Sequence, residues 1–403
     1  FFLGVGLCAG LSFCAQQPAA PQTPLQSVAV GHEFRQDDFP AIAAAPGGSM
    51  WVAWLSFGGD RDDIALRCHK DGRWGELHWV PGTSGDNWLP QVAVDSGNRV
   101  WVVWSGRVGD NWDIYARRFD PANDEWGPIE RLTDDPLPDT NPRLALDGKG
   151  RFALVWQGFR SRNSNVFLRH FDGMRWSATV RVTHHSANDW EPAAAIDGSG
   201  RVWVAYDSYR GGDYDVYLAC VNGSSVEHER QAAGTPAFEA RATVAVDTVG
   251  RVWVAWESGN PNWGKDWGYV TRDTHKGVSL GLARRPFVRC FANGRWMEPE
   301  SRLTSAFPEP EGTYQPHVFS DGQGSVWVAA KVRSNLAPYQ QRGHWSWRRQ
   351  GNYEYHLTHL DTDGWSKSQP LPFSRGRSST RINAALSADR QLWLAWDTDN
   401  RQE

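Results

Sequence analysis

Apolar residues recur along this chain in short runs that repeat at a nearly constant spacing. Each copy has a short apolar run that usually follows a proline, then a turn of Gly, Asp or Asn, then an alternating run of Val, Trp and Ala, as in residues 90–104. The other copies end at Trp54, Trp156, Tyr206, Trp256, Ala330 and Trp396. Self-similarity at a period of roughly 50 residues indicates a repeat architecture built from one supersecondary unit.

Each repeat contains four strand patterns. Strands a and b are the two runs on either side of the Gly/Asp/Asn turn. A polar loop leads to strand c, as in residues 113–117, and a second turn ending in Trp leads to a short strand d, as in residues 129–132. Four antiparallel strands repeated radially are the blades of a β-propeller. The pattern lacks helical periodicity, which disfavours a helical solenoid, so we predict an all-β, seven-bladed propeller over residues 25–403.

The two ends of the repeat region predict how the ring closes. Residues 24–40 match a strand d with the loop that follows it, whereas residues 382–396 supply strands a and b of the last repeat without a strand c. We therefore expect the N-terminal segment to provide strand d of an incomplete last blade. Because an open sheet edge invites wrong pairing, we also expect the natural polypeptide to continue past Glu403.

The first 24 residues predict export. Residues 1–13 form an apolar run that is too short to span a bilayer and has the length of a signal-peptide core. We assign residues 1–15 to a signal peptide with a truncated start and residues 16–24 to a Pro/Gln-rich linker. Residues 11–14 resemble a bacterial lipoprotein box, in which Cys14 would be acylated, although Phe13 replaces the small residue expected there. The expected location is periplasmic, extracellular or lipid-anchored.

Charge and cysteine content limit the classes of partner and cofactor that we expect for this chain. The net charge is −4 and the chain has no long basic run, which argues against nucleic acid. We expect membrane contact only through a lipid at Cys14, and a monomer. Cys68, Cys220 and Cys290 end similar strands in different repeats, so we expect free thiols. Motifs for zinc or phosphate binding are missing from the sequence, and no metal or cofactor is expected.

Tryptophan is several-fold over-represented, with 24 residues in the chain against roughly 1% in average proteins. Sixteen lie in strand b runs or in the turn before strand d, where large rings fill the space between blades, and Trp79 is placed in a strand d. The other seven fall in the b–c or d–a loops, which share one face of a propeller: Trp88, Trp112, Trp190, Trp263, Trp267, Trp345 and Trp347. Function is expected on that variable, loop-rich face.

Polar residues near these tryptophans suit sugar recognition, in which aromatic rings stack on CH faces and polar groups bind hydroxyls. The competing interpretation is structural, with Asp and Asn capping the loops and each Trp covering the end of a blade. The candidate ligand-binding residues are Trp88, Trp112, Trp190, Trp263, Trp267, Trp345, Arg107, Arg160, Arg210, Asp189, Asp213 and His184.

Two families share parts of this pattern. The strand c segment at residues 109–115 (GDNWDIY) resembles the repeats of TolB-type propellers, bacterial exported proteins that mostly bind other proteins. Residues 39–42, 49–54 and 71–74 are similar to the first blade of sialidases with short Asp-box (BNR) repeats. Asp38 stands where the sialidase Arg-Ile-Pro motif has its carboxylate-binding Arg, and the full Asp-box pattern is missing. The chain also resembles the N-terminal propeller of longer secreted proteins that carry a C-terminal hydrolase.

These observations predict an exported recognition module that binds a glycan or a protein through its loop-rich face and is non-catalytic by itself. The first alternative is a glycan-cleaving enzyme, either a sialidase-like glycoside hydrolase or a lyase. A hydrolase of this kind would use a pair of loop carboxylates. The second alternative is a scaffold for a downstream hydrolase domain. No catalytic residue is assigned.

Overall fold

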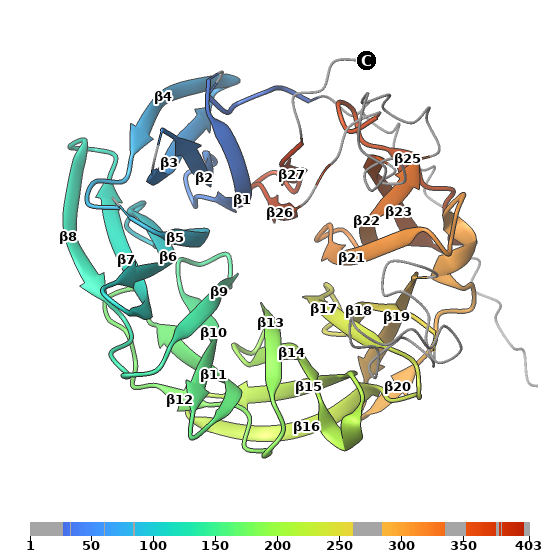
Figure 1. Cartoon of the computed structure of the whole chain (residues 1–403). Coiled ribbons are helices and arrows are strands. Elements are labelled where there is room, and N and C mark those ends of the chain that lie inside the picture. Colours follow the sequence, from blue (N-terminus) through green and yellow to red (C-terminus); the bar gives the residue numbers. More distant parts are fainter. Residues whose placement is uncertain are drawn as a thin grey trace, which may run out of the picture.

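Four-stranded antiparallel sheets are arranged in a ring (Figure 1). The computed structural model describes residues 27–398 except for 33, 60, 84, 261–283, 335–351, 376–378 and 380. The inner strands β1, β5, β9, β13, β17 and β21 surround the centre, and each contacts the inner strand of the next sheet. The fold is therefore an all-β propeller of four-stranded antiparallel blades, as predicted.

The blades follow one another along the chain. The first three are β1 (Gln36–Ala44), β2 (Met50–Gly58), β3 (Arg61–Lys70) and β4 (Arg73–Trp79); β5 (Asn87–Val94), β6 (Val100–Val108), β7 (Asn111–Asp120) and β8 (Glu125–Arg131); and β9 (Asp139–Leu146), β10 (Phe152–Arg160), β11 (Asn163–Phe171) and β12 (Val180–Arg181). The next two are β13 (Asp189–Ile196), β14 (Val202–Ser208), β15 (Asp215–Asn222) and β16 (Ser225–Ala233); and β17 (Glu239–Val246), β18 (Val252–Ser258), β19 (Arg285–Ala292) and β20 (Arg295–Met297).

The sixth blade has its outer strand in two short pieces. It contains β21 (Thr313–Ser320), β22 (Val326–Ser334) and β23 (Asn352–Asp361), with both β24 (Gly364–Trp365) and β25 (Gln369–Pro370) paired to β23. A separate two-stranded sheet follows, made of β26 (Ile382–Leu386) and β27 (Leu392–Trp396). Two single-turn 3₁₀ helices, η1 (Arg210–Gly212) and η2 (Leu303–Ala306), complete the described elements.

The blade count corrects the sequence prediction. Six blades, rather than seven, have four strands in the described part of the chain. The repeat count relied on the a–b hairpin, and the last copy supplies that hairpin alone, as β26 and β27. The strand d expected before residue 36 is also missing, because the described residues in 27–35 form no strand. A strand needs a hydrogen-bonded neighbour, and β27 pairs only with β26 in the described residues.

Strand b explains why the blades pack. Its side chains alternate between two faces, so Val102 and Trp104 of β6 contribute to a core shared with the first blade. Trp101 and Val103 point the other way, into a core that contains Phe152 of the third blade. Both faces of each central strand are thus buried against neighbours, as the near-continuous apolar run predicted.

In the turns between strands a and b, an Asp carboxylate organises the hairpin. Asp95 accepts hydrogen bonds from the Arg99 amide (3.1 Å), the Arg99 side chain (2.8 Å) and the Trp101 indole (3.1 Å). Residues in the same position are Asp147, Asp197, Asp247 and Asp321. Burial raises the pKa of Asp197, but the hydrogen bonds that it accepts outweigh burial and lower this pKa to about 2. These Asp residues stabilise the turns.

Candidate functional site

A β-bulge interrupts each of the six inner strands at the same place. In each strand the register shifts next to one residue, which directly precedes the proline of the repeat, or Ala242 in the fifth blade. This residue has a positive φ in every blade: Phe39 (54°), Leu89 (50°), Asn141 (56°), Glu191 (45°), Arg241 (59°) and Gln315 (45°). Positive φ is uncommon outside glycine, and bulges re-aim side chains. We call these six positions the bulge residues; they lie on the half of the ring that carries the b–c and d–a loops.

Side chains of strand b link one blade to the bulge of the next. The linking position directly follows the last aromatic residue of strand b. Asp207 accepts hydrogen bonds from the amides of Arg241 (2.8 Å) and Ala242 (3.3 Å) in the next blade. Glu257 accepts one from the Gln315 amide (2.8 Å). Buried acceptors at this position therefore satisfy backbone donors that the bulges release from the ladder.

The same position joins the two ends of the ring. The Asp397 carboxylate, directly after β27, accepts hydrogen bonds from the amide of Arg381 (2.8 Å) and from the amide of Phe39 in the first blade (3.4 Å). The Arg381 guanidinium lies 5.6 Å from the centre of the Phe39 ring, and this ring lies 4.4 Å from that of Trp88. Trp88 is 41% exposed. An exposed indole and a guanidinium thus both contact the Phe39 ring.

Lys331, which follows Ala330, holds the linking position in the sixth blade, and Leu55 holds it in the first. Neither side chain can accept a hydrogen bond, and Lys331 brings a cation instead. Burial and the nearby Arg381 lower the pKa of Lys331 to about 8, although Asp397 opposes the shift. The pKa of His317, on β21, is lowered to about 3 by burial and by Arg381, Arg143 and Lys331. Cationic groups from three parts of the ring therefore gather around one imidazole.

Glu257 forms a second buried centre beside this group. Its side chain is fully buried and accepts hydrogen bonds from Arg241 (2.5 Å) and Arg284 (2.6 Å) as well as from the Gln315 amide. Arg284 also lies 3.8 Å from the centre of the Phe238 ring. Charge-assisted bonds of this kind fix the side chains in place.

Aromatic side chains flank the same face at the fourth and fifth blades. The ring of Trp190 lies 5.3 Å from that of Tyr214 and 6.4 Å from that of Tyr209. Tyr214 in turn lies 5.2 Å from Phe238. Trp190, Tyr209 and Tyr214 are half-buried. Because Glu191 follows Trp190 in β13, this aromatic cluster adjoins the bulge residues.

The structure separates the other candidate residues predicted from the sequence. Arg107 is exposed and pairs with Asp86 (3.2 Å). Arg160 pairs with Asp135 (2.8 Å) and Asp139 (3.0 Å), and it lines a polar cavity of about 310 Å³. Trp112 lies at the start of β7, half-buried. Arg107 and Trp112 are therefore cross-strand neighbours on the second blade, whereas Arg160 lies on the third.

The remaining candidates lie around the fourth blade or outside the described residues. Arg210 pairs with Glu229 (2.7 Å) and lies 3.8 Å from Asp189, which is fully buried. Burial raises the pKa of the Asp189 carboxyl. Asp213 accepts a hydrogen bond from the Tyr214 amide (2.9 Å), and His184 is exposed in the loop before β13. The predicted residues outside the described part are Trp263, Trp267, Trp345 and Trp347.

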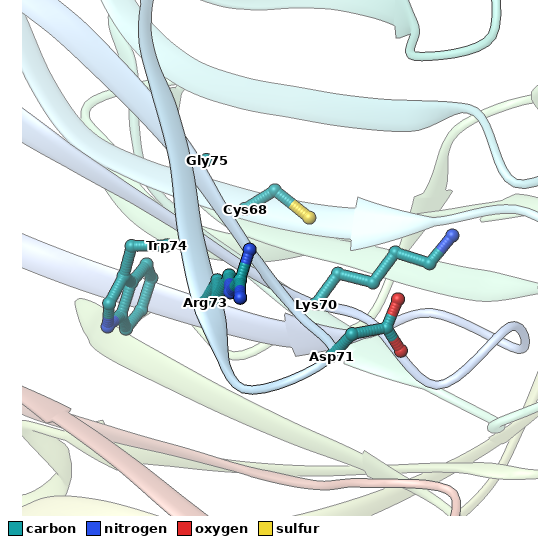
Figure 2. Close-up of a pocket in the computed structure, with 6 residues that line it drawn as sticks. All are labelled: Cys68, Lys70, Asp71, Arg73, Trp74 and Gly75. Atoms are coloured by element: carbon teal, nitrogen blue, oxygen red, sulfur yellow. The ribbon is translucent and has the colours of Figure 1, made fainter.

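A cavity of about 540 Å³ lies at the turn between β3 and β4 (Figure 2). Figure 2 shows Trp74 on the opposite side of the ribbon from Cys68 and Lys70. This arrangement agrees with their packing, because Cys68 adjoins the core shared with the second blade, whereas Trp74 packs against the core that Trp393 also contacts. The cavity lies at the c–d turn, on the face away from the bulge residues, and is therefore separate from them.

Among the described residues, no three His, Cys, Asp or Glu side chains are grouped so that they could hold a metal ion. No helix in that part of the chain has the length and apolarity needed to cross a bilayer.

The chain has a propeller fold whose structural neighbours include polysaccharide lyases and sialidases. An ulvan lyase from a new family of polysaccharide lyases is 13% identical, with a TM-score of 0.58, and the match covers 90% of this chain and 92% of that one. The NanB sialidase from Streptococcus pneumoniae is 8% identical, with a TM-score of 0.43, over 94% of this chain and 68% of that one. No protein-family profile or curated protein matches the sequence. The likeness to the ulvan lyase shows the fold alone.

Most of the charged residues near the centre of the ring were not predicted as site residues from the sequence. Arg143, His317, Lys331 and Arg381 were not among the candidates, although one signal was present. A polar residue directly follows the strand b aromatic in several repeats, as Gln157, Asp207 and Glu257 do. A polar residue inside an otherwise apolar strand requires a buried partner, and the partners here are the bulge amides of the next blade.

Proposed function

We propose that the chain recognises a glycan on the face that carries the bulge residues. The observation that supports this most directly is the array formed by Trp88, Phe39 and Arg381, in which an exposed indole and a guanidinium both contact the Phe39 ring. The half-buried cluster around Trp190 lies on the same face. Aromatic surfaces with a few placed polar groups are typical of carbohydrate and other small-ligand sites. The likeness to an ulvan lyase supports a glycan-active role through the fold alone.

Retention of the purified chain on a glycan panel tests this proposal, with Trp88→Ala as the test variant. We expect the wild type to bind at least one polysaccharide and Trp88→Ala to bind it roughly tenfold more weakly. The variant loses the indole surface on which a sugar ring would stack, and tenfold corresponds to about 1.4 kcal/mol. Trp79→Ala is the matched control, since Trp79 is 37% exposed but lies on the outer strand β4. Equal binding by all three proteins would contradict the assignment of the site.

Glycan cleavage is the second candidate function, favoured by His317 and Lys331. The pKa of Lys331 is lowered to about 8, near the range in which a general acid or base is most effective. The pKa of His317 is lowered to about 3, so its imidazole stays neutral and would orient a ligand by a hydrogen bond. The same panel distinguishes the two functions when product ends are measured together with retention. Retention without new ends supports recognition, whereas new reducing or unsaturated ends indicate an enzyme.

We also infer that β26 and β27 are the inner half of a seventh blade. The His69 ring lies 4.9 Å from Trp393, just as Phe119 of the second blade lies 5.9 Å from Trp51 of the first. In addition, Arg67 donates a hydrogen bond to the Val30 carbonyl (3.1 Å), as Arg169 does to Leu132 after β8 (2.6 Å). Val30 therefore takes the place of the end of a strand d.

A double-mutant cycle of His69→Ala and Trp393→Ala tests the seventh-blade inference. We expect a coupling free energy of about 0.5–1.5 kcal/mol, the range for aromatic pairs, measured by urea unfolding. The cycle of Phe119→Ala and Trp51→Ala, at an established blade interface, serves as the reference. Additive effects of the His69 and Trp393 substitutions would show that this contact is not a blade interface.

A further inference from the structure

Three cations from different blades converge near the axis of the ring. Arg143 lies on β9, Lys331 on β22 and Arg381 directly before β26. The pKa of Arg143 is lowered to about 10 by burial and then by Arg381, with Glu191 opposing. His317 feels all three cations, as described above. We call Arg143, Lys331, Arg381 and His317 the cationic centre.

The cations of this centre differ from three other arginines that pair directly with carboxylates. Arg241 and Arg284 both bind Glu257, and Arg160 binds Asp139. By contrast, within the described residues none of the three cations of the centre has a carboxylate oxygen within ion-pair distance. Arg143 instead donates to the Pro142 carbonyl (3.0 Å).

The acids nearest the centre already have other partners. Asp397 accepts two backbone amides, and Glu257 accepts two guanidinium groups and an amide. The charged groups that act on Lys331 are Arg381, Asp397, Arg241 and Glu257. Crowded cations in a desolvated place are costly unless an anion joins them.

We propose that the cationic centre binds an anionic substituent of the glycan, a carboxylate or a sulfate ester, so that the ligand is an acidic polysaccharide. This inference rests on the proposed glycan recognition. A guanidinium pair and an ammonium provide several donors for one oxyanion. The flanking Trp88 and Phe39 rings favour a sugar over a small inorganic anion, since they extend the surface beyond the charge. Lys331 places a cation at a position where Gln157, Asp207 and Glu257 accept hydrogen bonds, and departures of this kind commonly mark functional sites.

Binding should depend on pH through Lys331. The ammonium form is present below its pKa of about 8 and is lost above it. A bound anion stabilises the ammonium and raises this pKa in the complex. Affinity for an acidic polymer is therefore expected to be constant from pH 6 to 7 and to fall between pH 8 and 9.

The test compares a polyuronate with the same polymer after its carboxyl groups are reduced to neutral alcohols. We expect the wild type to bind the polyuronate at least tenfold more tightly, and Lys331→Met and Arg143→Gln each to lose roughly tenfold, the usual effect of removing a charged hydrogen-bond partner. A sulfated neutral polysaccharide in a parallel arm shows whether sulfate replaces carboxylate. Arg230→Gln, an exposed site on the outer strand β16, is the control.

Thermal unfolding distinguishes a binding role of Lys331 from a purely structural role. Because Lys331 is crowded by Arg381 and Arg241, Lys331→Met is expected to raise Tm while weakening binding; a purely structural lysine would lower Tm on removal. Equal binding of the charged and reduced polymers by the wild type would overturn the cationic centre and leave glycan recognition standing. Failure of both polymers and of every other polysaccharide on the panel to bind would overturn the proposed function. A Tm increase by free glucuronate or sulfate that is lost in Lys331→Met would then still support an anion site. With neither effect, both proposals fail.

Discussion

Trp156→Ala is expected to lower the free energy of unfolding by about 3–5 kcal/mol, the range for removing a large buried aromatic side chain. Trp156 is 0% exposed, and its ring lies 5.8 Å from that of Phe167. Its indole nitrogen donates a hydrogen bond of 2.8 Å to the buried carboxylate of Asp139. Alanine leaves a cavity between two blades and removes one donor from that carboxylate. Urea unfolding followed by circular dichroism measures the loss.

Trp88→Ala is the matched control for this prediction. Trp88 is also a tryptophan next to another aromatic ring, but it is 41% exposed. Its removal exposes little core, so we expect a loss below about 1 kcal/mol. Similar losses for the two variants would show that Trp88 supports the fold and would remove it from the proposed glycan surface.

Glu257→Ala is expected to cost about 3–5 kcal/mol, because breaking a buried ion pair leaves an uncompensated charge. Two guanidinium groups, those of Arg241 and Arg284, lose their carboxylate at once, and the Gln315 amide loses its acceptor. The side chain of Arg284 is 5% exposed, so water cannot replace the carboxylate fully. We therefore expect a clear shift of the urea midpoint.

Glu311→Ala provides the comparison for Glu257→Ala. Glu311 also pairs with an arginine, Arg285, but the two side chains are 65% and 46% exposed. Exposed pairs contribute about 0–1 kcal/mol, so the midpoint should hardly move. A loss for Glu257→Ala as small as for Glu311→Ala would mean that the buried arginines find other partners.

The blades could be predicted from the sequence because each one repeats the same alternation. The predicted strand b at residues 202–206 lies within β14, and the predicted strand c at 113–117 lies within β7. The number of complete blades could not be predicted from the a–b hairpins alone, since a hairpin such as that of β26 and β27 can occur without outer strands. Pairing with neighbours, which the local pattern does not contain, decides whether a segment such as residues 27–35 becomes a strand.

The centre of the ring was harder to predict than the blades. Trp88 and Trp190 were predicted to lie in loops, and they lie at the start of the inner strands β5 and β13. Arg143 and Lys331, however, are far apart in the sequence and meet only because the ring brings different blades to one axis. The bulges could not be predicted from the sequence either, since the positive φ of a residue such as Glu191 depends on the strands around it. The local pattern therefore places single residues in strands and loops, whereas closure of the ring decides which charged residues meet.

The hydrogen bond from Phe39 to Asp397 has a consequence for synthesis. The two residues are separated by 358 positions, so the Phe39 amide cannot form this hydrogen bond until the last described strand has been synthesised. Earlier blades can pack sequentially on the blade before them, because each linking side chain reaches the adjacent repeat. Contacts at such sequence separation slow folding. Joining of the first and last inner strands is therefore expected to be a late step, during which the nascent chain is an open arc.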